Sequence, residues 1–329
     1  LKCVKGIGWY IEEYGIAQLS LNLTNISVTT VHEAFDAACA RAIARGMRVT
    51  GSEIVGLIPK RVLIDAAHHY LRKQNRSLGI SEQEKVKVAV KSLGLDDLAP
   101  FDARKRVIEY LLEDAGENTA RLASMTLIEF ADETASESPA PGGGSISAYV
   151  GSLGVSLGTM VANLSAHKRG WDDRWESFSD VAAHGMALQS RLLQLVDEDT
   201  AAFDAIMSAF GLPKGNGAQK AERAAAIQAA TLGAMETPLE VAELALASME
   251  VMADMAKRGN PNSVTDAGVG ALCARTAVLG ATMNVRVNAA DLKDRSKADA
   301  MLARCIELED QAEAAEAAVR ARVREVLEG

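Results

Sequence analysis

One carboxylate stands within an apolar helical stripe. Over residues 192–210 the periodicity is helical, and each residue turns by about 100°. Asp199 points in the same direction as the apolar side chains of this segment, which are Leu192, Leu195, Val196, Phe203, Ile206, Met207 and Phe210. A carboxylate on the core side must be hydrogen-bonded, paired or placed beside a cavity, because burying it alone is costly. Asp199 is therefore either an acid–base group or a structural acid paired with an arginine or a helix end.

Asp197 and Glu198 point away from that stripe. Both are interpreted as surface charges. Asp197 is kept as a second, weaker candidate for the acid–base role.

A glycine-rich segment precedes a long uncharged stretch. Residues Gly142, Gly143, Gly144 and Ser145 place flexible backbone N–H groups at the start of a predicted helix. Such groups, at the positive end of the helix dipole, can hold an anion or a carbonyl-rich ring. The segment lacks the Lys-Ser/Thr pair of a phosphate-binding P-loop. The alternative is a plain flexible turn before a close-packed helix.

The uncharged stretch, residues 146–166, has the length of a membrane span. It is rich in Gly, Ser, Thr and Asn, which favours a buried helix over a span. Its smallest side chains recur on one helical face, so another backbone can approach closely. These residues are Ser147, Gly151, Gly154 and Gly158.

Two further polar groups are candidates for binding. Asn284 and Asn288 lie one turn apart, and Asp266 shares a helical face with Asn284. Amides donate and accept, which suits the edge of a heterocycle, although capping and interhelical bonds are equally compatible. Lys168 and Arg169 close the uncharged helix, where they either stabilise its dipole or bind a polyanionic substrate tail.

Composition limits the class of protein. The net charge of -9 argues against general binding to nucleic acid or to an anionic membrane. The 4 cysteines and 5 histidines are scattered, so no metal site is predicted. Unpaired cysteines without a secretory signal indicate a cytoplasmic protein.

Periodicity divides the chain into two predicted domains. Residues 1–115 mix a strand at 18–23 and a short strand at 48–50 with helices, which indicates a small α+β domain, half of a ferredoxin-like fold. A polar linker is expected at 114–121. Residues 122–329 show helical periodicity alone, which predicts a bundle of about seven helices. Its expected breaks are 138–144, 169–172, 211–217, 236–238, 259–263 and 291–295.

Several motifs resemble a known family. SPAPGGGS (138–145), LVDEDTAAF (195–203), LPK (212–214) and the run from GNPNS (259–263) to NVRVN (284–288) are similar to formimidoyltetrahydrofolate cyclodeaminase. KGIGWYIEEY (5–14), AQLSLNL (17–23) and GSEIVGLIP (51–59) resemble the carboxy-terminal subdomain of glutamate formimidoyltransferase. Their order is that of the bifunctional formimidoyltransferase-cyclodeaminases.

The resemblance implies closure of 5-formimidoyltetrahydrofolate to 5,10-methenyltetrahydrofolate with release of ammonia, a step of histidine degradation. It also implies a polyglutamylated folate substrate, no other cofactor, and self-association to a dimer or higher oligomer. The amino-terminal transferase subdomain, with the family's catalytic histidine, is expected to be lacking, so no transferase activity is expected from this chain alone. The alternatives are a methenyltetrahydrofolate cyclohydrolase and a non-catalytic folate-channelling subunit.

Roles follow for the candidate residues. Asp199, or failing it Asp197, would move protons and stabilise the cationic amidine. The backbone at 142–145 would hold the pterin or the amidine together with Asp266, Asn284 and Asn288. Lys168 and Arg169 would meet the glutamate tail.

Overall fold

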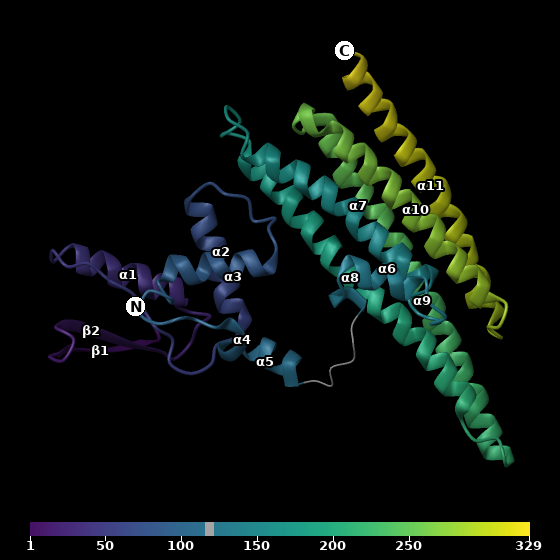
Figure 1. Ribbon diagram of the computed structural model, residues 1–329, viewed down its shortest axis with the longest axis horizontal. Coiled ribbons are helices and arrows are strands. Elements are labelled where there is room, and N and C mark those ends of the chain that lie inside the picture. Colours follow the sequence, from purple (N-terminus) through teal and green to yellow (C-terminus); the bar gives the residue numbers. More distant parts are fainter. Residues whose placement is uncertain (116–121) are drawn as a thin grey trace. The chain divides into compact units, whose positions relative to one another are not determined.

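The computed structural model describes residues 1–115 and 122–329 (Figure 1). The chain divides into two compact units, Leu1–Asn118 and Thr119–Gly329. The linker expected at 114–121 lies outside the described residues from 116 onward.

The first unit joins a β-hairpin to helices. Strands β1 (Val4–Ile11) and β2 (Ile16–Leu23) pair antiparallel. The helices are α1 (Val31–Ile43), α2 (Lys60–Lys73), α3 (Glu82–Leu93), α4 (Ala103–Arg106) and α5 (Ile108–Ala115). Helix α1 starts at Thr30 because this side chain and Glu33 form a reciprocal capping box. The core of the unit gathers around Leu63, Leu93 and Val107.

The strand predicted at 18–23 is confirmed as part of β2, whereas the strand predicted at 48–50 needs correction. The strand at 18–23 exists but is mostly exposed, because within the described residues the sheet has two strands and little covers it. The strand predicted at 48–50 is absent. There the chain is fixed to the end of α3 instead, since Ser52 N–H donates to the carbonyl of Gly94 at 2.9 Å. The small α+β class holds, and the ferredoxin-like arrangement stays a prediction.

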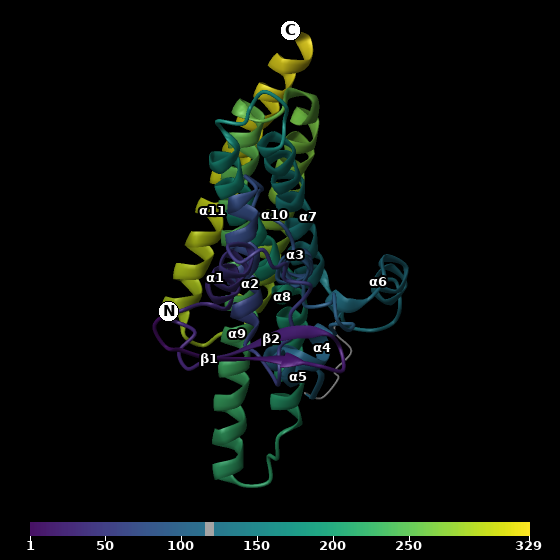
Figure 2. The same ribbon diagram turned by 90° about the vertical axis from the view of Figure 1, so that its left-hand side faces the viewer.

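The second unit is helical in its described part. Its helices are α6 (Leu127–Thr134), α7 (Gly143–Ala166), α8 (Trp175–Gly211), α9 (Gly217–Arg258), α10 (Val264–Ala289) and α11 (Arg295–Glu328). Short 3-10 turns lie at Leu122–Ser124 and Pro261–Ser263. The long helices α7 to α11 form the bundle (Figures 1 and 2). Five of the six predicted breaks fall between helices.

The sixth predicted break, at 236–238, is wrong, because α9 continues through Pro238. Proline has no N–H and leaves the carbonyl four residues earlier, that of Ala234, without its helical donor. The side-chain Nδ2 of Asn288 on α10 donates to this carbonyl at 3.1 Å. A neighbouring helix thus satisfies the backbone that the proline frees, and the helix does not end.

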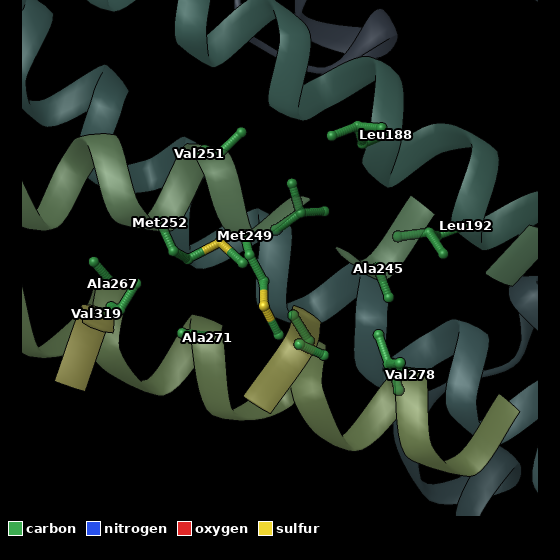
Figure 3. Close-up of a cluster of buried hydrophobic side chains, with 14 of the residues drawn as sticks. Leu188, Leu192, Ala245, Met249, Val251, Met252, Ala267, Ala271, Val278 and Val319 are labelled. Atoms are coloured by element: carbon green, nitrogen blue, oxygen red, sulfur yellow. The ribbon is translucent and has the colours of Figure 1, made fainter. Parts of the chain in front are cut away.

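The glycine face of α7 packs as predicted. A Cβ at Gly154 would lie 2.8 Å from the carbonyl oxygen of Gly270, and one at Gly270 would lie 2.7 Å from that of Gly154. Only glycine lets α7 and α10 approach this closely. Buried Leu192, Met249 and Met252 belong to the apolar core of the same bundle (Figure 3).

In the described part of the chain, α7 alone is long and apolar enough to cross a membrane. The other helices bury 61% of its apolar window, and a core helix of a bundle meets the same criteria. The burial favours the core interpretation.

Candidate functional site

The side chain of Asp199, a residue of α8, lies against the start of α7. The hydroxyl of Ser145 donates to Asp199 Oδ2 at 2.9 Å, and the Ser145 backbone N–H also bonds this carboxylate. The N-cap residue Gly142 has no side chain to cap the helix, so the carboxylate from α8 supplies that function. A Cβ at Gly144 would collide with the Asp199 carboxylate. The glycine is required for the carboxylate to reach the backbone of α7.

The environment of Asp199 sets its acidity. Burial raises the pKa of its carboxyl above the usual range, and the hydrogen bonds from Ser145 offset part of this rise. The side chain is half-buried, whereas Ser145 is fully buried. A carboxyl whose pKa is raised by burial is better suited both to accept and to return a proton. Asp199 therefore combines the structural function expected of a buried acid with the properties of an acid–base group.

The side chain of Asn284, on α10, also lies at the start of α7. A Cβ at Gly143 would lie 3.2 Å from Asn284 Nδ2, and Nδ2 donates to the carbonyl of Gly280 at 2.9 Å. The structure therefore gathers Gly143, Gly144, Ser145, Asp199 and Asn284 around one helix start.

Asn288 is used differently from the predicted ligand contact. Its Nδ2 donates to the carbonyls of Ala234 at 3.1 Å and Asn284 at 3.0 Å. Both amide hydrogens are thereby occupied. The interhelical alternative describes the first of these bonds, because the carbonyl of Ala234 on α9 is the one that Pro238 frees.

Lys168 and Arg169 lie at the other end of α7. This helix has 24 residues, which at 1.5 Å per residue separates its ends by roughly 36 Å. Lys168 Nζ lies 4.2 Å from the ring centroid of Trp171 and 3.3 Å from Asn260 Oδ1. Within one chain these cations therefore lie far from Asp199, and their contact with a glutamate tail stays a prediction.

Two other candidate carboxylates lie away from the start of α7, and for Asp197 this agrees with the direction that the sequence predicted. Asp266 lies in the first turn of α10, about 27 Å from Asn284 at 1.5 Å per residue. Asp197 points about 160° away from Asp199 around α8. Neither meets the start of α7 within one chain.

Sequence reasoning missed Thr200. Its hydroxyl lies 3.4 Å from that of Ser145, beside the carboxylate. Its only signal was its position next to Asp199, because its partner is 55 residues away in the sequence.

A separate hollow of about 340 Å³ lies in the first unit. There the rings of His32 and His69 stack with centroids 4.4 Å apart, and Asp36 accepts hydrogen bonds from His69, Tyr70 and Lys73. Burial, and then the charge of His69, lower the pKa of His32. In the described ranges, 1–115 and 122–329, no group of three His, Cys, Asp or Glu side chains could hold a metal ion. The residues lining the hollow are Thr30, His32, Asp65, His68, His69, Arg72 and Lys73.

Two family models match the chain. One, described as formiminotransferase-cyclodeaminase, covers residues 126–307. The other, described as formiminotransferase domain, covers residues 1–113. A formiminotransferase domain is thus present at the amino end, which corrects the expectation that the amino-terminal transferase subdomain is lacking.

Similar proteins include enzymes of folate chemistry. The mouse formimidoyltransferase-cyclodeaminase is 37% identical over 89% of this chain, which spans about half (54%) of that relative. The methenyltetrahydrofolate cyclohydrolase of Methylorubrum extorquens is 37% identical over 54% of this chain and 85% of its own length. The crystal structure of a formiminotetrahydrofolate cyclodeaminase from Thermotoga maritima is similar with a TM-score of 0.55 and 25% identity, over 62% of this chain and 98% of the other.

Proposed function

The chain belongs to the formiminotransferase-cyclodeaminase family, and from this we propose that its second unit closes 5-formimidoyltetrahydrofolate to 5,10-methenyltetrahydrofolate with release of ammonia. The observation that carries the proposal is the Asp199 carboxylate, half-buried against a helix start that only glycine permits. The folate is the substrate, and its polyglutamyl form is part of the proposal.

The reaction needs one group that moves a proton twice. Folate N10 attacks the amidinium carbon, and a C–N10 bond forms. Asp199 takes the proton from N10 and returns it to the exocyclic nitrogen, whose bond to carbon then breaks as ammonia leaves. The charge balances, since a cationic amidinium becomes a cationic methenyl product and neutral ammonia. The ionised carboxylate also stabilises the amidinium by charge.

The neighbours of Asp199 fix its position. Ser145 donates to Oδ2 of Asp199, which fixes the carboxylate at the start of α7. The Asn284 amide, placed against Gly143, is proposed to contact the pterin or the amidine. Holding N10 beside the amidine carbon supplies further acceleration.

Substitution of Asp199 tests the proposal. Asp199→Asn keeps the shape but cannot accept the proton, so ring closure, followed by methenyl absorbance, should slow by on the order of 10²–10⁴-fold. Asp197→Asn is the matched control, because this side chain lies on another face of α8, and its rate should stay near that of the wild type. A folded Asp199→Asn protein with the wild-type rate would remove Asp199 from the mechanism.

A second candidate is hydrolysis of 5,10-methenyltetrahydrofolate, favoured by the similarity to a cyclohydrolase. The two activities differ in the product that they release. Ammonia formed from 5-formimidoyltetrahydrofolate supports the cyclodeaminase, whereas loss of methenyl absorbance without ammonia supports the cyclohydrolase. Tight folate binding with neither turnover would indicate the channelling subunit.

Self-association is proposed to cover an apolar face. Helices α7 and α10 pack on each other, and both expose uncharged rows of residues. Such rows are uncommon on monomers. We expect the double variant Leu164→Glu/Met283→Glu to have a lower oligomeric state than the wild type in sedimentation. The control variant Ile306→Glu, on α11, should keep the wild-type state. An unchanged oligomeric state in the double variant would contradict the proposal. The exposed apolar residues are Leu153, Met160 and Leu164 on α7, and Val269, Leu272, Met283 and Val287 on α10.

Lys168 and Arg169 are proposed to serve the Asp199 site from a second copy, because they lie far from Asp199 along α7. Their contact with a glutamate tail stays a proposal. The cytoplasmic location is likewise proposed, on the 4 cysteines, all of which are free.

A further inference from the structure

Helix α8 continues past the start of α7. The two helices are antiparallel, since Gly151 of α7 packs on Leu192 while Ser145, nearer the start of α7, bonds Asp199. Residues 200–211 of α8 therefore extend roughly 18 Å beyond that point. With the first turns of α9 they form a hairpin that projects from the bundle, at the bottom of Figure 2.

The apolar face of α8 changes from buried to exposed at Asp199. Leu192 and Leu195 are 0% exposed, whereas Phe203 is 37% exposed. At 100° per residue, Phe203 lies about 40° from Asp199 around the helix and one turn further along. An aromatic ring is thus presented to solvent beside the carboxylate, on the side that α7 covers elsewhere.

The hairpin that carries Phe203 has both of its helix ends closed by hydrogen bonds. Nε and Nη2 of Arg223 on α9 donate to the carbonyl of Phe210 at 3.2 and 3.1 Å, which closes the end of α8. At the other side of the turn, Asn216 and Gln219 form a capping box at the start of α9. Both helix ends are satisfied, so Phe203 stands on a defined backbone.

We propose that Phe203 stacks on the planar pyrimidine half of the substrate's bicyclic ring while Asp199 pairs with the cationic amidine. This inference rests on the proposed function and adds a residue that selects for the ring. Charge and shape support this occupant together, because a carboxylate and an exposed aromatic face lie one turn apart. The amidine and the ring of 5-formimidoyltetrahydrofolate are joined directly at N5. Aromatic rings stack in offset geometry, and such stacking tolerates different heterocycles.

Three variants of the full chain test the inference. Phe203→Ala removes the stacking surface, Phe203→Trp keeps one, and Phe210→Ala removes a similar ring two turns further from Asp199. We expect Phe203→Ala to raise KM for ring closure about tenfold, with kcat changed by less than about threefold. Phe203→Trp should restore KM, and Phe210→Ala should leave it near that of the wild type.

Binding and assembly are measured on the same proteins. The Kd for 5-formyltetrahydrofolate, which needs no turnover, should rise about tenfold in Phe203→Ala. An unchanged Kd in Phe203→Ala, or an equal rise in Phe210→Ala, overturns the inference. So does dissociation of the oligomer in Phe203→Ala, since the face then belongs to a second copy. Failure of the wild-type protein to release ammonia would instead overturn the proposed function, and Kd would still decide the role of Phe203.

Discussion

Replacing Asn288 by alanine should destabilise the bundle through a carbonyl on another helix. Asn288 Nδ2 donates to the carbonyl of Ala234, a residue only 8% exposed, which Pro238 deprives of its helical donor. A buried acceptor left without a donor costs about 1–3 kcal/mol. We therefore expect Asn288→Ala to lower the free energy of unfolding by about 2 kcal/mol.

A second substitution isolates the cause. In a Pro238→Ala background the new N–H can donate to the carbonyl of Ala234, so Asn288→Ala should cost about 1 kcal/mol less than it does with the proline. The effect of Pro238→Ala alone cancels in this double-mutant cycle. Urea unfolding followed by far-ultraviolet circular dichroism measures each protein.

A control separates this coupling from general loosening of α9. Gln228 Nε2 donates to the carbonyl of Asp291 at 3.0 Å, an amide contact from the same helix that does not involve the proline. Gln228→Ala should cost the same in both backgrounds. If the loss caused by Asn288→Ala is also the same in both, within about 0.3 kcal/mol, the proposed role of the amide is refuted.

Three other predictions follow from local contacts. Gly144→Ala should displace the Asp199 carboxylate, slow ring closure at least tenfold and lower the free energy of unfolding by about 1–3 kcal/mol. The control is Gly233→Ala on α9, where a Cβ meets open space, and this variant should raise the free energy of unfolding by about 0.5–1 kcal/mol. Equal urea midpoints for the two variants would contradict this prediction. Ser145→Ala removes hydrogen bonding that lowers the pKa of Asp199, so the acidic limb of the pH profile of kcat/KM should move to higher pH, and a limb that stays would exclude Asp199 as the base. Burial lowers the pKa of His32 in the folded protein below its ordinary value of 6.5. As the pH falls below 6.5, His32 therefore binds a proton more readily in the unfolded chain than in the folded one. The contribution of His32 to the stability of the first unit should be full above pH 6.5 and be lost as the pH drops below it. His32→Gln should show a weaker fall in urea midpoints between pH 7.5 and 5, and an equal fall would exclude His32.

Periodicity alone was enough for much of the second unit. The helical repeat of 3.6 residues determines which face of a helix each side chain occupies, and neighbouring residues in the sequence are enough to detect it. This repeat predicted the inward direction of Asp199, the glycine face of α7 and five of the six helix breaks. The exposure of β2 and the loss of the strand at 48–50 could not be found in this way. Both depend on which other segments cover or pair with these residues.

Only the tertiary structure decided which polar residues meet. Helices of 24 and 26 residues carry Lys168 and Asp266 far from the start of α7, whereas antiparallel packing brings Asp199 to Ser145 across 54 residues of sequence. Packing between helices also places the amide of Asn288 where it donates to the carbonyl of Ala234, which Pro238 leaves without a helical donor. Helix α9 therefore continues where its sequence predicts an end. Spacing along a chain fixes the face of a helix that a side chain occupies. Which helix packs against that face, and at what height, depends on contacts between distant segments.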